Sequence, residues 1–349
     1  MTHPSLLCLL LTVLALPNLC DCFGTTGVLA FADPLKTSRF HDTITNAAVC
    51  KVQYDWLIRK NSQLVLQSPN PLEYKPCPYD NWASALNNIF LPARAVSQEF
   101  AASSIKPDVD QNMKNNPIYH FDSDLKISDT NVRLIAERTT IINALKAQAP
   151  NYNDLRASIG ASLHTIQDFY SHTNWIEMGK TQPNAHIAVD TDLSIQIAPP
   201  EMAMCSDCSR DAMTPQQLQQ VNDWENNPTN KLLELLGWSY DPLNVFLCKN
   251  NIVNNGYLTS GYISSEEATA PKIASQMKCS HGGGADSSSR ITATGGINKD
   301  TNSFLYSPHY ELHSAAADMA VQATIDYLEG IRVAVNNENN FGRLLGLFN

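Results

Sequence analysis

Residues 161–179 read ASLHTIQDFYSHTNWIEMG, and this stretch has the most informative residue spacing in the chain. His164, Asp168 and His172 recur every four residues. An apolar stripe at helical spacing surrounds them, made of Leu155, Ile159, Leu163, Ile166 and Tyr170. This periodicity predicts a helix, with Asn153 or Asp154 as the residue that caps its start.

The three polar residues suggest a metal site on that helix. Side chains four residues apart lie near one another on one helix face. Imidazole and carboxylate groups are ligands that zinc takes in proteins, so His164, Asp168 and His172 predict a zinc site. The alternative is that both histidines are ordinary helix residues and the aspartate is an acid that is solvated or accepts a hydrogen bond from an N–H group.

Helical patterns dominate the rest of the chain. They run from about 38 to 56, from about 83 to 93 with Pro92 as a kink or break, from 132 to 145, from 215 to 224, from 231 to 236 and from about 308 to 327. Strand signals are sparse, so we expect an all-α, multi-helix bundle. With 349 residues, 43% of them hydrophobic, the chain can bury a substantial core.

The first 22 residues have the features of a secretory signal peptide. An apolar run over residues 5–16 is followed by Pro17 and by Cys20 and Cys22 at the −3 and −1 positions. The run is too short for a membrane helix, and no later stretch reaches the roughly 20 apolar residues that one needs. We therefore expect a secreted, extracellular protein without a transmembrane segment, whose residues 23–349 form a single helical domain.

The cysteines are consistent with an oxidising compartment. Three of the nine lie in the expected signal peptide, which leaves Cys50, Cys77, Cys205, Cys208, Cys248 and Cys279. An even set in a secreted chain predicts disulfides. Cys205 and Cys208 could instead form half of a zinc site or a redox pair, but no second CxxC motif accompanies them. We expect Cys248 and Cys279 to pin a loop-rich insertion over about 248–306.

The net charge of −10 argues against a nucleic-acid-binding surface that works by neutralising phosphates. It does not exclude a nuclease or phosphodiesterase pocket, because bound zinc ions would dominate the local charge.

Several segments resemble known families. Residues 161–179, NPIYHFDSD (116–124), CSHGG (279–283), GGINKD (295–300) and SPHYELHSAAADMA (307–320) resemble the N-terminal region of von Willebrand factor A domain-containing protein 7 and the fungal heterokaryon-incompatibility protein Het-C. The His-x-x-x-Asp helix is more distantly similar to that of zinc-dependent phospholipases C and single-strand-specific fungal nucleases.

The similarity to these hydrolases implies one to three zinc ions and further ligands. His120 resembles a histidine that those enzymes place on an earlier helix, with Asp108 or Asp110 as the upstream acid that ligates metal or acts as a base, and Asp122 as another candidate. His41 resembles the histidine of their early helix, which joins a third metal.

A later helix in these hydrolases supplies a histidine and an acid four residues apart to the second metal. His309 and His313 match it, except that this chain has a histidine where the family has the acid. The alternative is a pair of helix-terminal histidines bonded to the backbone. His186 and Asp190 form a competing match that ranks lower, and His281 is interpreted as a loop residue.

Two hypotheses of function follow. The first is a secreted zinc-dependent phosphodiesterase, in which Asp168 bridges metals and the substrate is a phospholipid or single-stranded nucleic acid. The second is a non-catalytic extracellular module that keeps the helical scaffold in order to bind an extracellular protein.

Overall fold

The computed structural model describes residues 37–60, 68–75, 77–78, 87–206, 208, 213–228, 231, 248, 250–253, 256–263, 277–283 and 293–348. The α-helices in this part of the chain are α2 (His41–Lys60), α3 (Asn87–Ser104), α4 (Lys106–Val109), α5 (Ile127–Lys146), α6 (Tyr152–His172), α7 (Pro215–Glu225), α9 (His313–Val335) and α10 (Glu338–Leu344). Single 3-10 turns are η2 (Pro71–Glu73), η5 (Pro117–Tyr119), η6 (Asp124–Lys126) and η10 (Tyr310–Leu312). Two-residue strands β1 (Lys278–Cys279) and β2 (Ala293–Thr294) pair in parallel. The predicted all-α class is confirmed.

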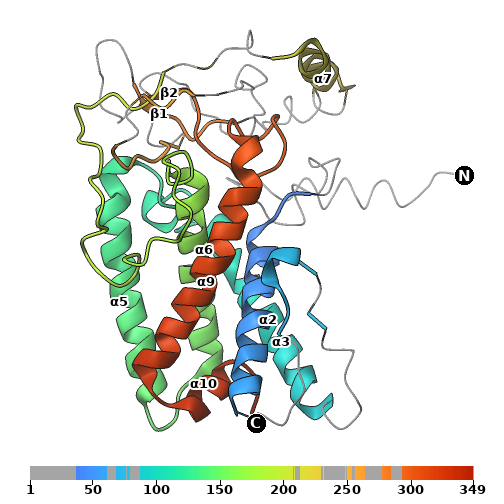
Figure 1. Cartoon of the computed structure of the whole chain (residues 1–349), viewed down its shortest axis with the longest axis vertical. Coiled ribbons are helices and arrows are strands. Elements are labelled where there is room, and N and C mark those ends of the chain that lie inside the picture. Colours follow the sequence, from blue (N-terminus) through green and yellow to red (C-terminus); the bar gives the residue numbers. More distant parts are fainter. Residues whose placement is uncertain are drawn as a thin grey trace, which may run out of the picture.

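The long helices form a bundle with α6 at its centre. Helices α2, α3, α5 and α9 all pack against α6, and they run lengthwise side by side in Figure 1. The buried apolar side chains of α6, among them Ile159, Leu163 and Phe169, belong to one continuous core. The β1–β2 pair and α7 lie at the end of the bundle opposite the C-terminus (Figure 1).

The packing of α6 against α3 is unusually close at Gly160. A Cβ atom on Gly160 would lie 2.3 Å from Ser103 Cβ and 3.0 Å from the Phe100 carbonyl oxygen. The predicted α6 helix is confirmed, but the predicted cap is wrong. Asn151 caps it, because the Asn151 side chain accepts a hydrogen bond from the Asp154 N–H.

Other expected helices differ in their ends. Helix α3 continues through Pro92 without a break. Helix α7 begins at Pro215, as predicted, and the Thr214 hydroxyl accepts a hydrogen bond from the Gln217 N–H. Helix α9 begins at His313, later than expected, because the residues before it form the η10 turn. The expected signal peptide and, apart from Lys231, the expected helix over 231–236 lie outside the described residues.

Three disulfides confirm that the cysteines are structural. Cys50 pairs with Cys77, Cys205 with Cys279, and Cys208 with Cys248. The two cysteines of the CxxC motif therefore bond to different partners, and these partners are Cys248 and Cys279. Much of the expected insertion over 248–306 lies outside the described residues. Single bridges join Thr173 at the end of α6 to Ser260, and Tyr262 to Ser280, so these loops cover the end of α6. Among the described helices, none is long and apolar enough to span a bilayer.

Candidate metal centre

A buried cluster of histidines and aspartates surrounds the C-terminal half of α6. Its members are His41, Asp108, His120, Asp122, His164, Asp168, His172, His281 and Asp300. They come from the first residue of α2, from α4, from the segment between η5 and η6, from α6, and from the loops after β1 and β2. Seven of the nine are at most 1% exposed, whereas Asp300 is 3% and His281 5% exposed.

Asp168 lies at the middle of the cluster and faces imidazoles on two sides. Its Oδ2 lies 2.9 Å from His164 Nε2 and 3.2 Å from His120 Nδ1. Its Oδ1 lies 3.1 Å from His41 Nε2 and 4.0 Å from His172 Nε2. The helical spacing that the sequence suggested thus places one carboxylate between two groups of nitrogen atoms.

We call the first of these groups the first lobe: His120 Nδ1, His164 Nε2, Asp168 Oδ2 and Asp108 Oδ1. The two nitrogens are 3.0 Å apart. Asp108 Oδ1 lies 3.5 Å from His164 Nε2 and 3.9 Å from His120 Nδ1. The second lobe consists of His172 Nε2, His281 Nε2 and the Asp300 carboxylate, and Asp168 lies between the lobes.

The outer nitrogen of five imidazoles faces a carbonyl oxygen. The pairs are His41 Nδ1 with Gln167 Oε1 (2.7 Å), His120 Nε2 with Met113 O (3.3 Å), His164 Nδ1 with Ser104 O (2.7 Å), His172 Nδ1 with His120 O (2.8 Å) and His281 Nδ1 with Gly282 O (3.1 Å). A carbonyl oxygen only accepts, so each of these outer nitrogens donates its proton. In the neutral ring the inner nitrogen then presents a lone pair to the cluster, as in histidines that ligate metals.

Burial and charge act differently on the two lobes. Burial lowers the pKa of His164 to about 3 despite the opposing Asp168 charge, so its imidazole is neutral. Burial raises the pKa of Asp168, but the imidazoles that face it, His164 and His172 first among them, outweigh burial and hold that pKa well below its usual value. In the second lobe, burial lowers the pKa of His281, but Asp300 outweighs burial and raises it to about 9. The second lobe therefore strongly favours a positive charge.

The carboxylates of the cluster fit a site for a cation. Asp122 Oδ2 and Asp168 Oδ1 have no hydrogen-bond partner among the described residues, although both side chains are buried. Asp122 Oδ1 is 3.0 Å from His172 Nδ1, which also lies 2.8 Å from the His120 carbonyl oxygen. Against the opposing effect of burial, Asp122 helps to raise the pKa of His172 well above its usual value. Buried carboxylates without hydrogen bonds are costly unless a cation compensates them. Three residue sets could hold an ion, with donor atoms within 4.8 Å: His41, Asp108 and His164; His120, His164 and Asp168; and Asp122, His172 and His281.

Three of the predicted site residues lie outside the cluster. His309 Nδ1 is 2.6 Å from Glu177 Oε1, and its Nε2 is 2.9 Å from Asn251 Oδ1. Both nitrogens of His313 bond to the backbone, donating to Lys299 O and accepting from the Arg39 N–H. At His313 the structure therefore agrees with the alternative of a histidine that bonds to the backbone. Asp110 accepts from the Asn112 N–H in a surface turn, so of the two upstream acids only Asp108 reaches the cluster.

His281 and Asp300 were not among the predicted ligands. Both belong to irregular loops, where no fixed spacing marks residues that converge. The only sequence signal was that they fall inside the CSHGG and GGINKD segments. The lower-ranked pair, His186 and Asp190, is 3.2 Å apart but lies on the surface, away from the cluster.

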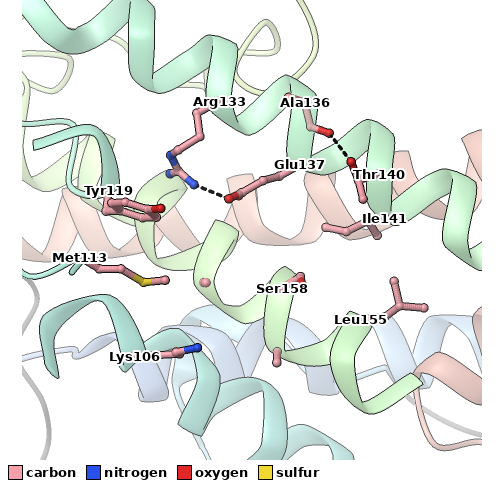
Figure 2. A pocket seen from close by; sticks show the side chains of 12 residues that line it. Lys106, Met113, Tyr119, Arg133, Ala136, Glu137, Thr140, Ile141, Leu155 and Ser158 are labelled. Atoms are coloured by element: carbon pink, nitrogen blue, oxygen red, sulfur yellow. Dashed lines mark hydrogen bonds and ion pairs between the residues drawn. The ribbon is translucent and has the colours of Figure 1, made fainter. Parts of the chain in front are cut away.

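A pocket of about 390 Å³ lies between α5 and α6 beside the cluster (Figure 2). Met113 and Tyr119 line one end, Ile141 and Leu155 the other, and Lys106 extends into it from below in this view. No cluster side chain lines this pocket. It shares a wall with the cluster, because the Met113 carbonyl accepts the His120 hydrogen bond.

The VWA7 N-terminal domain family matches residues 88–226 and 244–341 of this chain. The chain belongs to this family. Every cluster residue except His41 lies within the matched ranges. The matched ranges therefore include the bundle helices other than α2 and most of the candidate site.

Individual relatives agree with this assignment. Von Willebrand factor A domain-containing protein 7 of Mus musculus is 32% identical over 259 residues, which are 73% of this chain and 24% of the relative. The Rattus norvegicus protein is 33% identical over the same shares, and the Homo sapiens protein 31% identical over 255 residues. The chain thus spans about a quarter of the length of these relatives. No solved structure matches.

Proposed function

We propose that this protein is a secreted domain that holds zinc in the first lobe. The observation that supports this best is the spacing of four donor atoms, which are 2.9 to 3.9 Å apart in the five pairs measured. A tetrahedral zinc site with bonds of about 2.0–2.1 Å has donor atoms roughly 3.4 Å apart. His120, His164, Asp168 and Asp108 would be the ligands.

The donor types favour zinc over other common metals. Calcium and magnesium prefer sites made only of oxygen ligands, whereas imidazole nitrogen suits zinc and its neighbours in the first transition row. The His164 imidazole is already neutral, with its pKa lowered to about 3 by burial, and so binds metal without first losing a proton. Secretion is supported by the three disulfides, which are typical of an oxidising compartment.

The activity that we propose for this centre is hydrolysis of a phosphodiester, in a phospholipid or in single-stranded nucleic acid. The supporting observation is that the two Asp168 oxygens face two different groups of imidazoles, as a carboxylate shared between two metals would. Bound zinc supplies Lewis-acid stabilisation of phosphoryl oxygens and acidifies a water molecule. In this chain Asp168 would fix the position of the two lobes relative to each other. The histidines whose outer nitrogens donate to carbonyl oxygens would keep their inner nitrogens directed at the metal.

A second candidate is a non-catalytic module that binds an extracellular protein and uses the metal to hold its fold. The burial of the first lobe favours it, because all four of its side chains are at most 1% exposed. A four-ligand, closed zinc site is the usual form of a structural centre.

An activity assay separates the two candidates. Zinc-loaded wild type is tested on phosphatidylcholine vesicles, single-stranded DNA and a chromogenic phosphodiester, beside Asp168→Asn. The matched control is Asp190→Asn, which changes the exposed His-x-x-x-Asp pair instead. Hydrolysis by wild type and Asp190→Asn but not by Asp168→Asn supports the enzyme. If zinc-replete wild type cleaves none of these substrates faster than Asp168→Asn, the binding module is the better account.

A further inference from the structure

The pocket between α5 and α6 has a polar end and an apolar end. Its volume of about 390 Å³ falls within the range of about 300–1,000 Å³ that is usual for small-molecule sites. Tyr119 and Lys106 lie toward one end, and Ile141 and Leu155 toward the other (Figure 2). Between the two ends Figure 2 shows the small side chain of Ser158. The pocket therefore has room for a ligand that is itself polar at one end and apolar at the other.

The geometry points to a binding site for a single-chain amphiphile with an anionic head group. The head lies at Lys106 and Tyr119, and the apolar chain extends toward Ile141 and Leu155. No side chain of the metal cluster lines this pocket, so binding there requires no metal.

One ion pair in the pocket wall is already complete within the protein. Arg133 Nη1 lies 2.8 Å from Glu137 Oε1, and Arg133 Nε and Nη2 donate to Ile118 O and Thr165 Oγ1. The other Glu137 oxygen accepts from the Ser162 hydroxyl. The two charges compensate each other, so this part of the wall favours neither an anion nor a cation.

Lys106 supplies the remaining charge of the pocket. Its side chain is exposed, and its ammonium group has no hydrogen bond or ion pair with any residue that the structure describes. The Tyr119 hydroxyl likewise has no partner among the described residues, while the Tyr119 ring is held under the Arg133 guanidinium, 4.3 Å from its centroid. A carboxylate or phosphate accepts hydrogen bonds from both kinds of donor. This end of the pocket therefore favours an anionic head group.

The opposite end of the pocket makes no polar demand on a ligand. Ile141 and Leu155 are core residues whose side chains line the pocket, and Thr140 beside them donates its hydroxyl to Ala136 O. Met113 adds a flexible, polarisable side chain that adapts to irregular apolar ligands. Ala136 and Thr140 are exposed, so the pocket opens to solvent and an alkyl chain can enter without disrupting the core.

Calorimetric titration with defined amphiphiles, below their micelle-forming concentrations, tests this site. The probes are dodecanoate, decanoate and dodecyl phosphate, with dodecyltrimethylammonium as the control of opposite charge. Each buried methylene group changes the affinity by about fourfold, so decanoate should bind about fifteenfold more weakly than dodecanoate. Both dodecyl anions should bind more tightly than the cation. Tighter binding of dodecyl phosphate than of dodecanoate favours a phospholipid-derived head group, and the reverse order favours a fatty acid.

Two variants, each with a matched control, locate the ligand. Lys106→Met should weaken binding of both anions by up to about fivefold and bring their affinity closer to that of the cation. Lys146→Met, which changes an exposed lysine outside the pocket, should leave binding unchanged. Ser158→Trp places a large ring in the pocket and should weaken binding at least tenfold, whereas Ser128→Trp, on an exposed part of α5 outside the pocket, should not.

Several results would overturn the proposal: no saturable binding of either dodecyl anion, equally tight binding of the cation, or undiminished binding to Ser158→Trp. Binding that is lost with EDTA or in His164→Asn would place the ligand at the metal centre and overturn it as well. Binding that persists in both cases supports it, even if the protein holds no zinc. Circular dichroism shows whether each variant keeps the helical fold, and Ala136→Trp replaces Ser158→Trp if the latter is unfolded.

Discussion

Replacing Asp168 by asparagine should weaken the fold far more than replacing any exposed acid. The Asp168 carboxylate is fully buried and lies 2.9 to 3.2 Å from nitrogens of His41, His120 and His164. Removing one partner from a buried ionic group typically costs about 3–5 kcal/mol. At about 2–4 °C per kcal/mol, this corresponds to a fall in Tm of about 6–20 °C, with the lower values suited to a chain of this length.

The chain offers a matched control at Asp190. His186 and Asp190 have the same spacing as His164 and Asp168 and are 3.2 Å apart, but the Asp190 side chain is 64% exposed. Asp190→Asn should change the free energy of unfolding by less than about 0.5 kcal/mol.

Urea unfolding followed by circular dichroism, with and without EDTA, measures both effects. If zinc at 100 times its Kd stabilises the native state, chelation removes about 2.7 kcal/mol from wild type and from Asp190→Asn. It should remove nearly nothing from Asp168→Asn, which has lost the shared ligand. An Asp168→Asn variant that unfolds like wild type and responds equally to EDTA would refute the reasoning.

Three further predictions follow from other contacts. Burial raises the pKa of Glu177, but Lys299 and His309 outweigh burial and lower that pKa to about 2. The ionised Glu177 carboxylate therefore stabilises the fold fully above about pH 4.5, and this stabilisation is lost as the pH falls through about 2. Glu177→Gln should lower the free energy of unfolding by up to about 3 kcal/mol at pH 7, and urea titrations should show this loss becoming smaller toward pH 2. A loss that does not change with pH would contradict this. Gly160→Ala should destabilise the fold by about 1–3 kcal/mol, because the added Cβ would lie 2.3 Å from Ser103 Cβ. The control Gly330→Ala adds a Cβ that contacts only the end of the Arg138 side chain, so in thermal scans it should be neutral or stabilise by up to about 1 kcal/mol. The double variant Cys205→Ser, Cys279→Ser removes a disulfide that joins residues 74 positions apart, and it should lower the free energy of unfolding by about 4 kcal/mol. Peptide mapping of the unreduced wild type should find the three disulfides described above, and any other pairing would contradict the structure.

The sequence predicts the helical part of the site well. The spacing of His164, Asp168 and His172 is a helical signal, and a helix converts spacing along the chain directly into proximity in space. The apolar stripe on the same helix indicates that α6 is buried in the bundle, which is what the structure has.

The loop-borne part of the site could not be predicted in the same way. His281 and Asp300 reach the cluster through irregular backbone that is held by the Cys205–Cys279 bridge and by bonds such as that of the His281 N–H to Tyr262 O. Pairing of cysteines cannot be deduced from their positions in a sequence. His313 shows the opposite limit. Its four-residue spacing from His309 indicates neither that α9 begins only at His313 nor that backbone groups contact both His313 nitrogens.

The most direct test of the account is the zinc content of the purified, secreted protein after dialysis against a metal-free buffer. Elemental analysis should find at least one zinc ion per chain in wild type and none in the His164→Ala, Asp168→Ala double variant. A wild-type protein that folds as a helical bundle and is free of zinc, or stoichiometric zinc that persists in the double variant, would contradict the claim that this buried cluster is a metal centre.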